Sequence, residues 1–504
     1  MALAYLTMRI ARIRPFLACA LLCVALAAVG CARTRVVGAS GSDGSEPEAG
    51  AADSTPPKHN SLIAGTGSEL LGDTNPILGD IDGDGFDDFL VSAYLPESID
   101  DEQNVVHYLF YGRPEFPERL STADADASIL ASVGPVRPLG DITGDGLADF
   151  AIQTPRGDIE FVLGDRARKH GQYALYAGGP VWRAPTLPPP FAAGFSTLNA
   201  AIGAGDIDCD GIDDVILSAM REAKADEPLE GSVLFGLVHA NYVIRGSKSI
   251  PSGEWDPRWA VARFGSQFEA EALLSARDLD GDGCQDLVGN VANTVYVYYG
   301  GPNVFQADIA PSEADAALQL PAAAGYAPLG DLDGDGFGDL LFQSMEQSQV
   351  YVVYGPKQRW SGNVQLTVDL TLQVGAPWFV PVSVEAGDID GDALPELVIG
   401  WSAAIAGDEL NPLVTPGAMY AVRSSGTRLR GAYSLGPRDK LQVAPAGPLL
   451  PATAPGAIGV GYGAPFSMAG DVDGDGGNDI IAGVPELGEA GGVYIIPSTP
   501  RAPD

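Results

Sequence analysis

The chain has 504 residues, of which 46% are apolar, and its 66 acidic against 29 basic residues give a net charge of −37. This acidic balance argues against nucleic acid as a partner, because phosphates would be repelled. Length and apolar content allow a large buried core, and length alone would permit roughly two to four domains.

The N-terminal segment is typical of a targeting sequence rather than of a folded domain. Three arginines precede an apolar run over residues 16–29, which ends at Gly30-Cys31. This order matches a secretory signal, and the small residues before Cys31 resemble a bacterial lipobox. We expect a lipoprotein-type signal in residues 1–30, lipidation at Cys31 and export to the outer membrane or cell surface, with the lipid as the only membrane contact. A plain secretory signal or a single membrane anchor is the alternative.

Residues 31–60 are rich in Gly, Ser, Pro, Ala and acidic residues, which predicts a flexible tether. Beyond Cys31 the chain has two cysteines, Cys209 and Cys284. They lie in successive copies of the acidic motif described next, and export permits oxidation. The sequence is compatible with a disulfide between them and with two free thiols.

A nine-residue acidic motif occurs seven times, beginning with DIDGDGFDD at Asp80–Asp88. The copies, here loops 1 to 7 with positions 1 to 9, begin at Asp80, Asp141, Asp206, Asp278, Asp331, Asp388 and Asp471. Carboxylates recur at positions 1, 3, 5 and 9. Glycine fills position 4 and position 6 in six copies each, which suits a tight turn with positive φ. Four carboxylates in nine residues repel one another without a cation.

Calcium is the predicted cation, because it binds about six to eight oxygens. Carboxylates of positions 1, 3, 5 and 9 (Thr143 at one position 3) and the carbonyl of position 7 are the predicted ligands of up to seven structural ions. They are Asp80, Asp82, Asp84, Phe86, Asp88; Asp141, Thr143, Asp145, Leu147, Asp149; Asp206, Asp208, Asp210, Ile212, Asp214; Asp278, Asp280, Asp282, Cys284, Asp286; Asp331, Asp333, Asp335, Phe337, Asp339; Asp388, Asp390, Asp392, Leu394, Glu396; and Asp471, Asp473, Asp475, Gly477, Asp479.

These loops differ from EF-hands, which require Glu at position 12 and a helix on each side. Here short apolar runs follow the motif, for example 89–91 and 340–342, so each loop is expected to join two strands. Thr143 removes one carboxylate from loop 2, and Ala393 replaces a turn glycine in loop 6. We expect these two loops to lose calcium first.

The spacing of the motif predicts the architecture. Successive copies lie 53 to 83 residues apart, which leaves room for four short strands each, and strand-rich repeats of this length indicate a propeller or solenoid. We predict an all-β, seven-bladed β-propeller of four-stranded antiparallel blades over residues 61–499, with a tail at 500–504. Only two strands follow loop 7, so Ser61–Ala64 is expected to complete the last blade and close the ring.

The acidic loops, the strand after each, and the aromatic runs TVYVYYG (294–300) and QVYVVYG (349–355) resemble FG-GAP repeats, the units of the integrin α-subunit propeller. The resemblance covers residues 61–499. The two sequence tags of the family have partial counterparts in Phe264-Gly265, Tyr462-Gly463 and Gly483-Val484-Pro485. It implies calcium loops on one face and a protein or polysaccharide ligand on the opposite face.

Five tryptophans, Trp182, Trp255, Trp259, Trp378 and Trp401, are candidates for that ligand face, with packing between blades as the alternative. No zinc-spaced histidines, G-x-S-x-G motif or phosphate-binding glycine loop occurs, so we do not expect an enzyme. Adhesion or ligand recognition at the cell envelope is the expected function. A polysaccharide-processing enzyme or its substrate-binding partner, and a non-catalytic scaffold, are the alternatives.

Overall fold

The protein is described from a computed structural model, which divides into residues 1–57 and 58–504. The described residues are 60–498, apart from 67–69, 73, 96–103, 132–135, 155, 174–178, 185–197, 223–236, 265–272, 292, 303–306, 320–324, 345–348, 375–380, 402–403, 409–410, 416–417, 423, 425, 436–465 and 485–490. The predicted signal, nearly all of the tether, the tail, Cys31 and Trp378 lie outside them.

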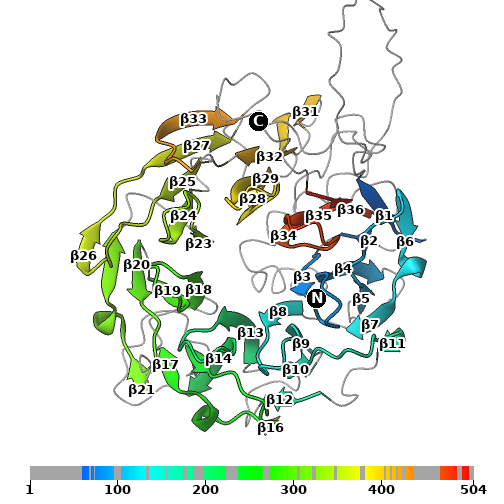
Figure 1. Ribbon diagram of the computed structural model, residues 1–504, viewed down its shortest axis with the longest axis horizontal. Helices are drawn as coiled ribbons and strands as arrows, with labels where there is room; N and C mark the ends of the chain where they lie inside the picture. The colour runs from blue at the N-terminus through cyan, green and yellow to red at the C-terminus, as the bar shows by residue number, and fades with distance from the viewer. Residues whose placement is uncertain are drawn as a thin grey trace, which may run out of the picture. The chain divides into compact units, whose positions relative to one another are not determined.

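The second unit is an all-β ring of seven blades (Figure 1). The first strand of each blade lies at the ring centre (Figure 1). Blade 1 contains β3 (Ile77–Gly79), β2 (Leu70–Leu71), β4 (Asp88–Leu95), β5 (Asn104–Phe110) and β7 (Ala127–Ala131). Blade 2 contains β8 (Val136–Gly140), β9 (Asp149–Gln153), β10 (Ile159–Val162) and β12 (Val181–Arg183). Blade 3 contains β13 (Leu198–Gly205), β14 (Asp214–Glu222), β15 (Leu237–Ile244) and β17 (Ala262–Phe264).

Blades 4 and 5 repeat this pattern, and blades 6 and 7 vary it. Blade 4 contains β18 (Leu273–Arg277), β19 (Asp286–Val291), β20 (Thr294–Tyr298) and β22 (Ala316–Gln319). Blade 5 contains β23 (Gly325–Gly330), β24 (Asp339–Ser344), β25 (Gln349–Val353) and β27 (Leu370–Val374). Blade 6 has β28 (Pro381–Gly387), β29 (Glu396–Trp401) and β32 (Ala418–Val422), with a hairpin of β30 (Ala404–Asp408) and β31 (Asn411–Thr415). Blade 7 has β34 (Phe466–Gly470), β35 (Asp479–Val484) and β36 (Gly492–Ile496).

The predicted ring closure is confirmed. β1 (Ser61–Ala64) pairs antiparallel with β36, from Ser61 opposite Ile495 to Ala64 opposite Gly492, and so becomes the fourth strand of blade 7. The innermost strands of neighbouring blades contact one another around the whole ring, and β34 of blade 7 contacts β3 of blade 1. Pairing the two ends of the folded chain removes an open sheet edge.

Most blades also have a fifth strand, which the sequence analysis did not anticipate. The link between the third and fourth strands of one blade crosses to the preceding blade and pairs parallel with its outer strand. The strands added in this way are β6 (Arg119–Ser121), β11 (Gly171–Tyr173), β16 (Gly253–Glu254), β21 (Ala307–Ile309), β26 (Gly362–Gln365) and β33 (Gly431–Leu435). They cover edges that would otherwise be exposed. The predicted fourth strand of blade 6, at 440–443, lies outside the described residues.

Three 3₁₀ helices, η1 (Thr122–Asp124), η2 (Pro257–Trp259) and η3 (Pro311–Glu313), lie just before outer strands. Within the described part of the chain, no helix has the length and hydropathy needed to cross a membrane.

The hydrophobic core lies between blades rather than at one centre. The second and third strands of a blade bury side chains on both faces, and these form separate clusters with the neighbouring blade. The cluster between blades 7 and 1 includes Ile63 of β1 and Ile481 of β35, both completely buried. Full burial of such a side chain contributes roughly 1.5–3 kcal/mol.

Candidate metal loops

All seven acidic motifs connect the first strand of a blade to the second, so the pattern of antiparallel strands puts them at the same end of every blade. They lie between β3 and β4, β8 and β9, β13 and β14, β18 and β19, β23 and β24, β28 and β29, and β34 and β35. The predicted strand–loop–strand arrangement is confirmed.

The aspartate at position 1 organises the turn. In loop 1, Asp80 Oδ1 accepts the N–H groups of Gly83 (2.6 Å) and Asp84 (3.2 Å), and Oδ2 accepts that of Gly85 (2.9 Å). Gly83 and Gly85 have φ of 76° and 92°, as the glycine pattern predicted. A short carboxylate side chain is suited to such local bonds with the backbone. The same bonds to position 6 recur in the other six loops.

The carboxylate at position 9 is completely or almost completely buried in every loop. Asp88 accepts the Ile81 N–H (3.0 Å) within its own loop and the Gly112 N–H (2.8 Å) at the end of the third strand. Glu396 makes the equivalent pair of bonds in loop 6, to Ile389 and Ser424. Burial raises the pKa of Asp88 to about 8 and that of Glu396 to about 7. A cation beside these groups would favour their charged forms.

The predicted ligands of several loops converge. Carboxylate oxygens of positions 1, 3 and 9 lie within 4.8 Å of one another in loops 1, 5 and 6, and those of positions 1, 3 and 5 do so in loops 3 and 4. Two buried oxygens, Asp208 Oδ1 and Asp333 Oδ1, have no hydrogen-bond donor. Buried oxygens without donors in an all-oxygen cluster fit a hard divalent cation.

At position 7, the backbone N–H donates to the position 5 aspartate in every loop, at 2.9–3.2 Å. Coordination by the carbonyls of these residues stays a prediction.

Neighbouring loops also bind each other directly, which the sequence analysis missed. The position 8 N–H donates to the position 1 carbonyl of the preceding loop at six of the seven boundaries, as from Ala148 to Asp80 (2.9 Å). Loop 6 has Pro395 at this position, which has no N–H. Position 8 holds Asp, Ala, Asp, Gln, Gly, Pro and Asn in turn, so its side chains give no common signal for a bond that the backbone makes.

The position 7 side chain packs against position 4 of the preceding loop. A Cβ added to Gly83 would lie 2.8 Å from Leu147, and one added to Gly474 would lie 2.4 Å from Phe86. At Gly83 and Gly474, position 4 therefore requires glycine for close approach as well as for its positive φ. At the boundary of blades 3 and 4, the same two positions hold Cys209 and Cys284, which form a disulfide. Of the two states that the sequence left open for these cysteines, the structure has the disulfide.

Four loops also contact an arginine, which sequence reasoning did not find. Arg168 pairs with Asp82 and Asp84 of loop 1, and Arg245 pairs with Asp208 of loop 3 (Nε–Oδ2 2.6 Å). Arg359 pairs with Asp280 and Asp282 of loop 4, and Arg428 with Asp333 and Asp335 of loop 5. These partners come from links far along the chain, so only the folded ring reveals them.

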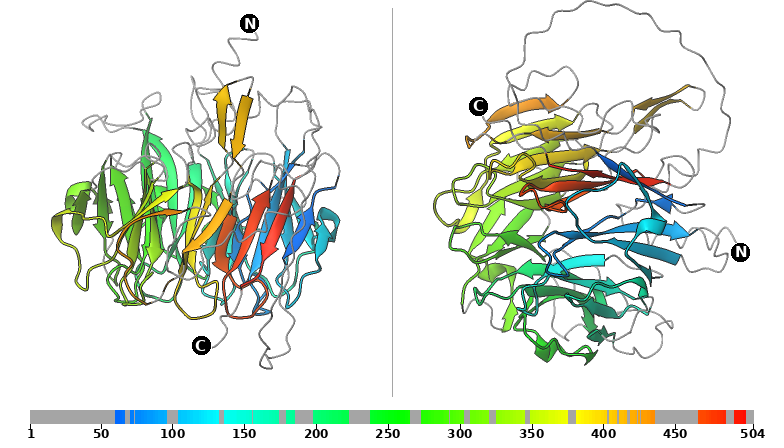
Figure 2. Two further views of the ribbon diagram at one scale, coloured as in Figure 1. Left: turned by 90° about the horizontal axis from the view of Figure 1, so that it is seen from above. Right: turned by 45° about the vertical axis from the view of Figure 1, so that its right-hand side comes forward.

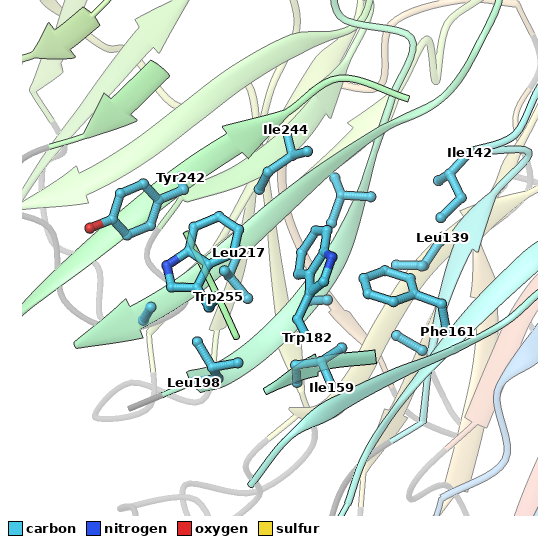
Figure 3. Close-up of a cluster of buried hydrophobic side chains, with 14 of the residues drawn as sticks. Leu139, Ile142, Ile159, Phe161, Trp182, Leu198, Leu217, Tyr242, Ile244 and Trp255 are labelled. Carbon is cyan, nitrogen blue, oxygen red and sulfur yellow. The ribbon is translucent and has the colours of Figure 1, made fainter. Parts of the chain in front are cut away.

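The tryptophans of blades 2 and 3, which were candidates for a ligand face, are buried or half-buried. Trp182 is 1% exposed and Trp255 is 7% exposed; Figure 3 shows Trp182 between Phe161 and Trp255. Trp259 is half-buried and packs on both. Trp182 and Trp255 therefore follow the alternative that the sequence left open: they fill the space between two blades and are not exposed anchors. Trp401 ends β29, where only its backbone is described.

Strand order and loops together define the chain as a seven-bladed β-propeller with an acidic loop at the same end of each blade. No protein-family model matches it. It is similar to the crystal structure of BBS1N in complex with ARL6DN soaked with mercury, at 10% identity and a TM-score of 0.38, over 88% of this chain and 97% of that one. The lead-soaked crystal of the same complex gives 9% identity and a TM-score of 0.36, over 85% and 98%. These values are too low to bear on function.

Proposed function

We propose that the protein is a calcium-stabilised, exported propeller of the FG-GAP type that recognises a protein or polysaccharide at the cell envelope. The observation that carries the calcium assignment is the convergence of carboxylate oxygens in one loop after another, with a buried position 9 carboxylate in each. When bound, Ca²⁺ would supply the positive charge that these desolvated carboxylates lack. Metal that binds only the folded chain stabilises it by linkage.

Carboxylates at positions 1, 3, 5 and 9 would hold the ion, and the backbone bonds of positions 1 and 9 hold the turn around it. Because position 9 also bonds the end of the third strand, each ion would tie three strands of its blade together. Calcium would therefore act as a structural element rather than as a catalytic one.

Ligand recognition is assigned to the face opposite the loops. In blade 3, β14 and β15 pair over eight residues up to Glu222 opposite Leu237, whereas β24 and β25 of blade 5 pair over five. The hairpin of β30 and β31 lies at the end of β29 that is remote from loop 6, and it projects beyond the ring (Figure 2, left). Extra structure on this face supports recognition there, and the export signal and lipobox of the sequence support an envelope location.

The calcium assignment is tested by counting bound calcium in purified residues 60–504 and by measuring the melting temperature with calcium and with EGTA. We expect several ions per chain and a lower melting temperature in EGTA. Asp145→Asn should empty loop 2, which has three carboxylates, and lower the count by one. Asp256→Asn, which removes a carboxylate paired with Arg258 outside the loops, should leave the count unchanged. No bound calcium and identical melting in EGTA would overturn the assignment.

Recognition is tested separately, by retention of the same fragment on envelope polysaccharides and on whole cells, with calcium and with EGTA. Calcium-dependent retention without a reaction product supports the proposal. Product formation would indicate an enzyme, and no retention by folded protein would overturn recognition of these ligands.

A further inference from the structure

Three of the arginines that contact acidic loops occupy equivalent places in the ring. Arg168, Arg359 and Arg428 lie in the links between the third and fourth strands of blades 2, 5 and 6. Each pairs with the position 3 and position 5 aspartates of the preceding blade's loop. The contacts therefore cross three blade boundaries, and the arginine and the loop are 77 or more residues apart along the chain.

A tyrosine of the preceding blade fixes each arginine. Arg168 lies over the ring of Tyr111, with 4.8 Å between the guanidinium carbon and the ring centroid. The next residue, Lys169, donates its N–H to the Tyr111 hydroxyl (2.6 Å). Arg359 over Tyr299 (4.8 Å) and Arg428 over Tyr354 (5.2 Å) repeat the stacking, and Trp360 and Leu429 repeat the hydrogen bond.

Loop 5 shows which atoms the arginine uses. Arg428 pairs with Oδ2 of Asp333 and with Oδ2 of Asp335 (Nη2–Oδ2 2.7 Å), and it donates to the Gly355 carbonyl (2.7 Å). Asp333 is only 7% exposed, and its other oxygen, Oδ1, is buried without a hydrogen-bond donor. The guanidinium thus neutralises the outer side of the carboxylate, while the inner oxygen is left for a second cation.

We propose that Arg168, Arg359 and Arg428 are built-in counter-charges, which hold their blade boundaries closed without calcium and weaken calcium binding at loops 1, 4 and 5. The inference rests on the calcium sites proposed above. A guanidinium beside two carboxylates reduces their repulsion when no ion is bound, and it repels a divalent ion that arrives later.

Each of these arginines lowers the net negative charge that its loop offers to calcium. Arg168 and Arg359 reduce the net charge of the four predicted ligand carboxylates in loops 1 and 4 from −4 to −3. Arg428 does the same in loop 5, where Lys357 Nζ also lies 4.0 Å from Asp335 Oδ2. Because the number of ligand charges tunes calcium affinity, loops 1, 4 and 5 should bind calcium more weakly with their arginine than without it.

The test is Arg428→Gln in residues 60–504, with the melting temperature measured over a calcium titration from EGTA to saturation. Arg430→Gln is the matched control, because Arg430 is two residues away in the same link but pairs with Asp369 outside any acidic loop. Arg168→Gln, at a more exposed arginine, provides an independent second variant.

We expect Arg428→Gln to melt at a lower temperature than Arg430→Gln in EGTA and to recover most of the difference at saturating calcium. In the titration, the lowest calcium concentration at which the melting temperature of this variant rises should be roughly tenfold lower than for wild type. This is the size of effect expected for removing one nearby positive charge. Equal destabilisation with and without calcium, or a shift to higher calcium, would overturn the proposal, since the arginine would then act as a simple ion pair or as a support for the ligands. If neither wild type nor variants respond to calcium, the proposed calcium sites fail as well.

Discussion

Asp87 and Asp471, which are 384 residues apart, exchange two hydrogen bonds. The Asp87 N–H donates to the Asp471 carbonyl (2.9 Å), and the Asp471 N–H donates to an Asp87 carboxylate oxygen (2.9 Å). The pair Asp213 and Asp141, between blades 3 and 2, makes the same exchange. The boundary between blades 7 and 1, where the ring closes, therefore has the same hydrogen bonds as a boundary inside the ring. β1 adds its pairing with β36 to this closure.

Deletion of β1 should open this boundary. Removing residues 60–66 deletes Leu62 and Ile63, which are buried against blade 7, and leaves β36 with an unpaired edge. We expect a loss of at least about 4 kcal/mol in the free energy of unfolding, on the scale of two large buried side chains. Deleting 35–58 should change it by less than about 0.5 kcal/mol. Chemical denaturation measures both, and equal effects would contradict the closure.

The disulfide should stabilise the boundary of blades 3 and 4. It encloses 75 residues, and a cross-link of this span stabilises a fold by about 2–4 kcal/mol. The double variant Cys209→Gly, Cys284→Leu places at this boundary the same pair of residues that meets between loops 1 and 2, where Gly83 is position 4 and Leu147 is position 7. We expect it to fold with a lower denaturation midpoint and to be insensitive to a reducing agent, which should destabilise wild type. A reducing agent with no effect on wild type would argue against the disulfide.

The sequence predicted the features that depend on local pattern. The repeated spacing of Asp80 and its counterparts was enough for the number of blades, the strands after each loop and the closing role of β1. Features that depend on how blades meet could not be predicted in the same way. Arg428 reaches Asp333 over 95 residues, and no local pattern marks such a pair. Trp182 was ambiguous because an apolar ring gives the same sequence signal in a core and on a binding face.

Ala393 should be a point of backbone strain in loop 6. It has a φ of 68° at position 6, where the other loops have glycine. A left-handed conformation costs a residue with a Cβ about 1 kcal/mol relative to glycine, so Ala393→Gly should raise the free energy of unfolding by about that amount. Gly211→Ala is the reciprocal control, because Gly211 has a φ of 87° and open space around it. It should destabilise the protein by a similar amount. A destabilising Ala393→Gly or a stabilising Gly211→Ala would contradict the assigned turn.

His107 should make the protein sensitive to acid independently of the metal loops. Its ring is 1% exposed, its Nδ1 lies 2.7 Å from the Ser92 hydroxyl, and burial lowers its pKa to about 4. Between about pH 6.5 and 4 the unfolded chain binds a proton that the folded chain does not. The contribution of His107 to the free energy of unfolding is therefore fully present above pH 6.5. It falls as the pH drops, by roughly 3 kcal/mol at pH 4.

His107→Asn keeps an acceptor for the Ser92 hydroxyl but does not titrate. We expect it to be less stable than wild type at pH 7.5 and to lose less stability on acidification, so that the two unfolding free energies converge near pH 4. Comparing the variants in the same calcium-containing buffers at each pH cancels the titration of all other groups. Parallel pH profiles would show that His107 takes up its proton at the same pH in the folded and unfolded states, and would contradict the lowered pKa.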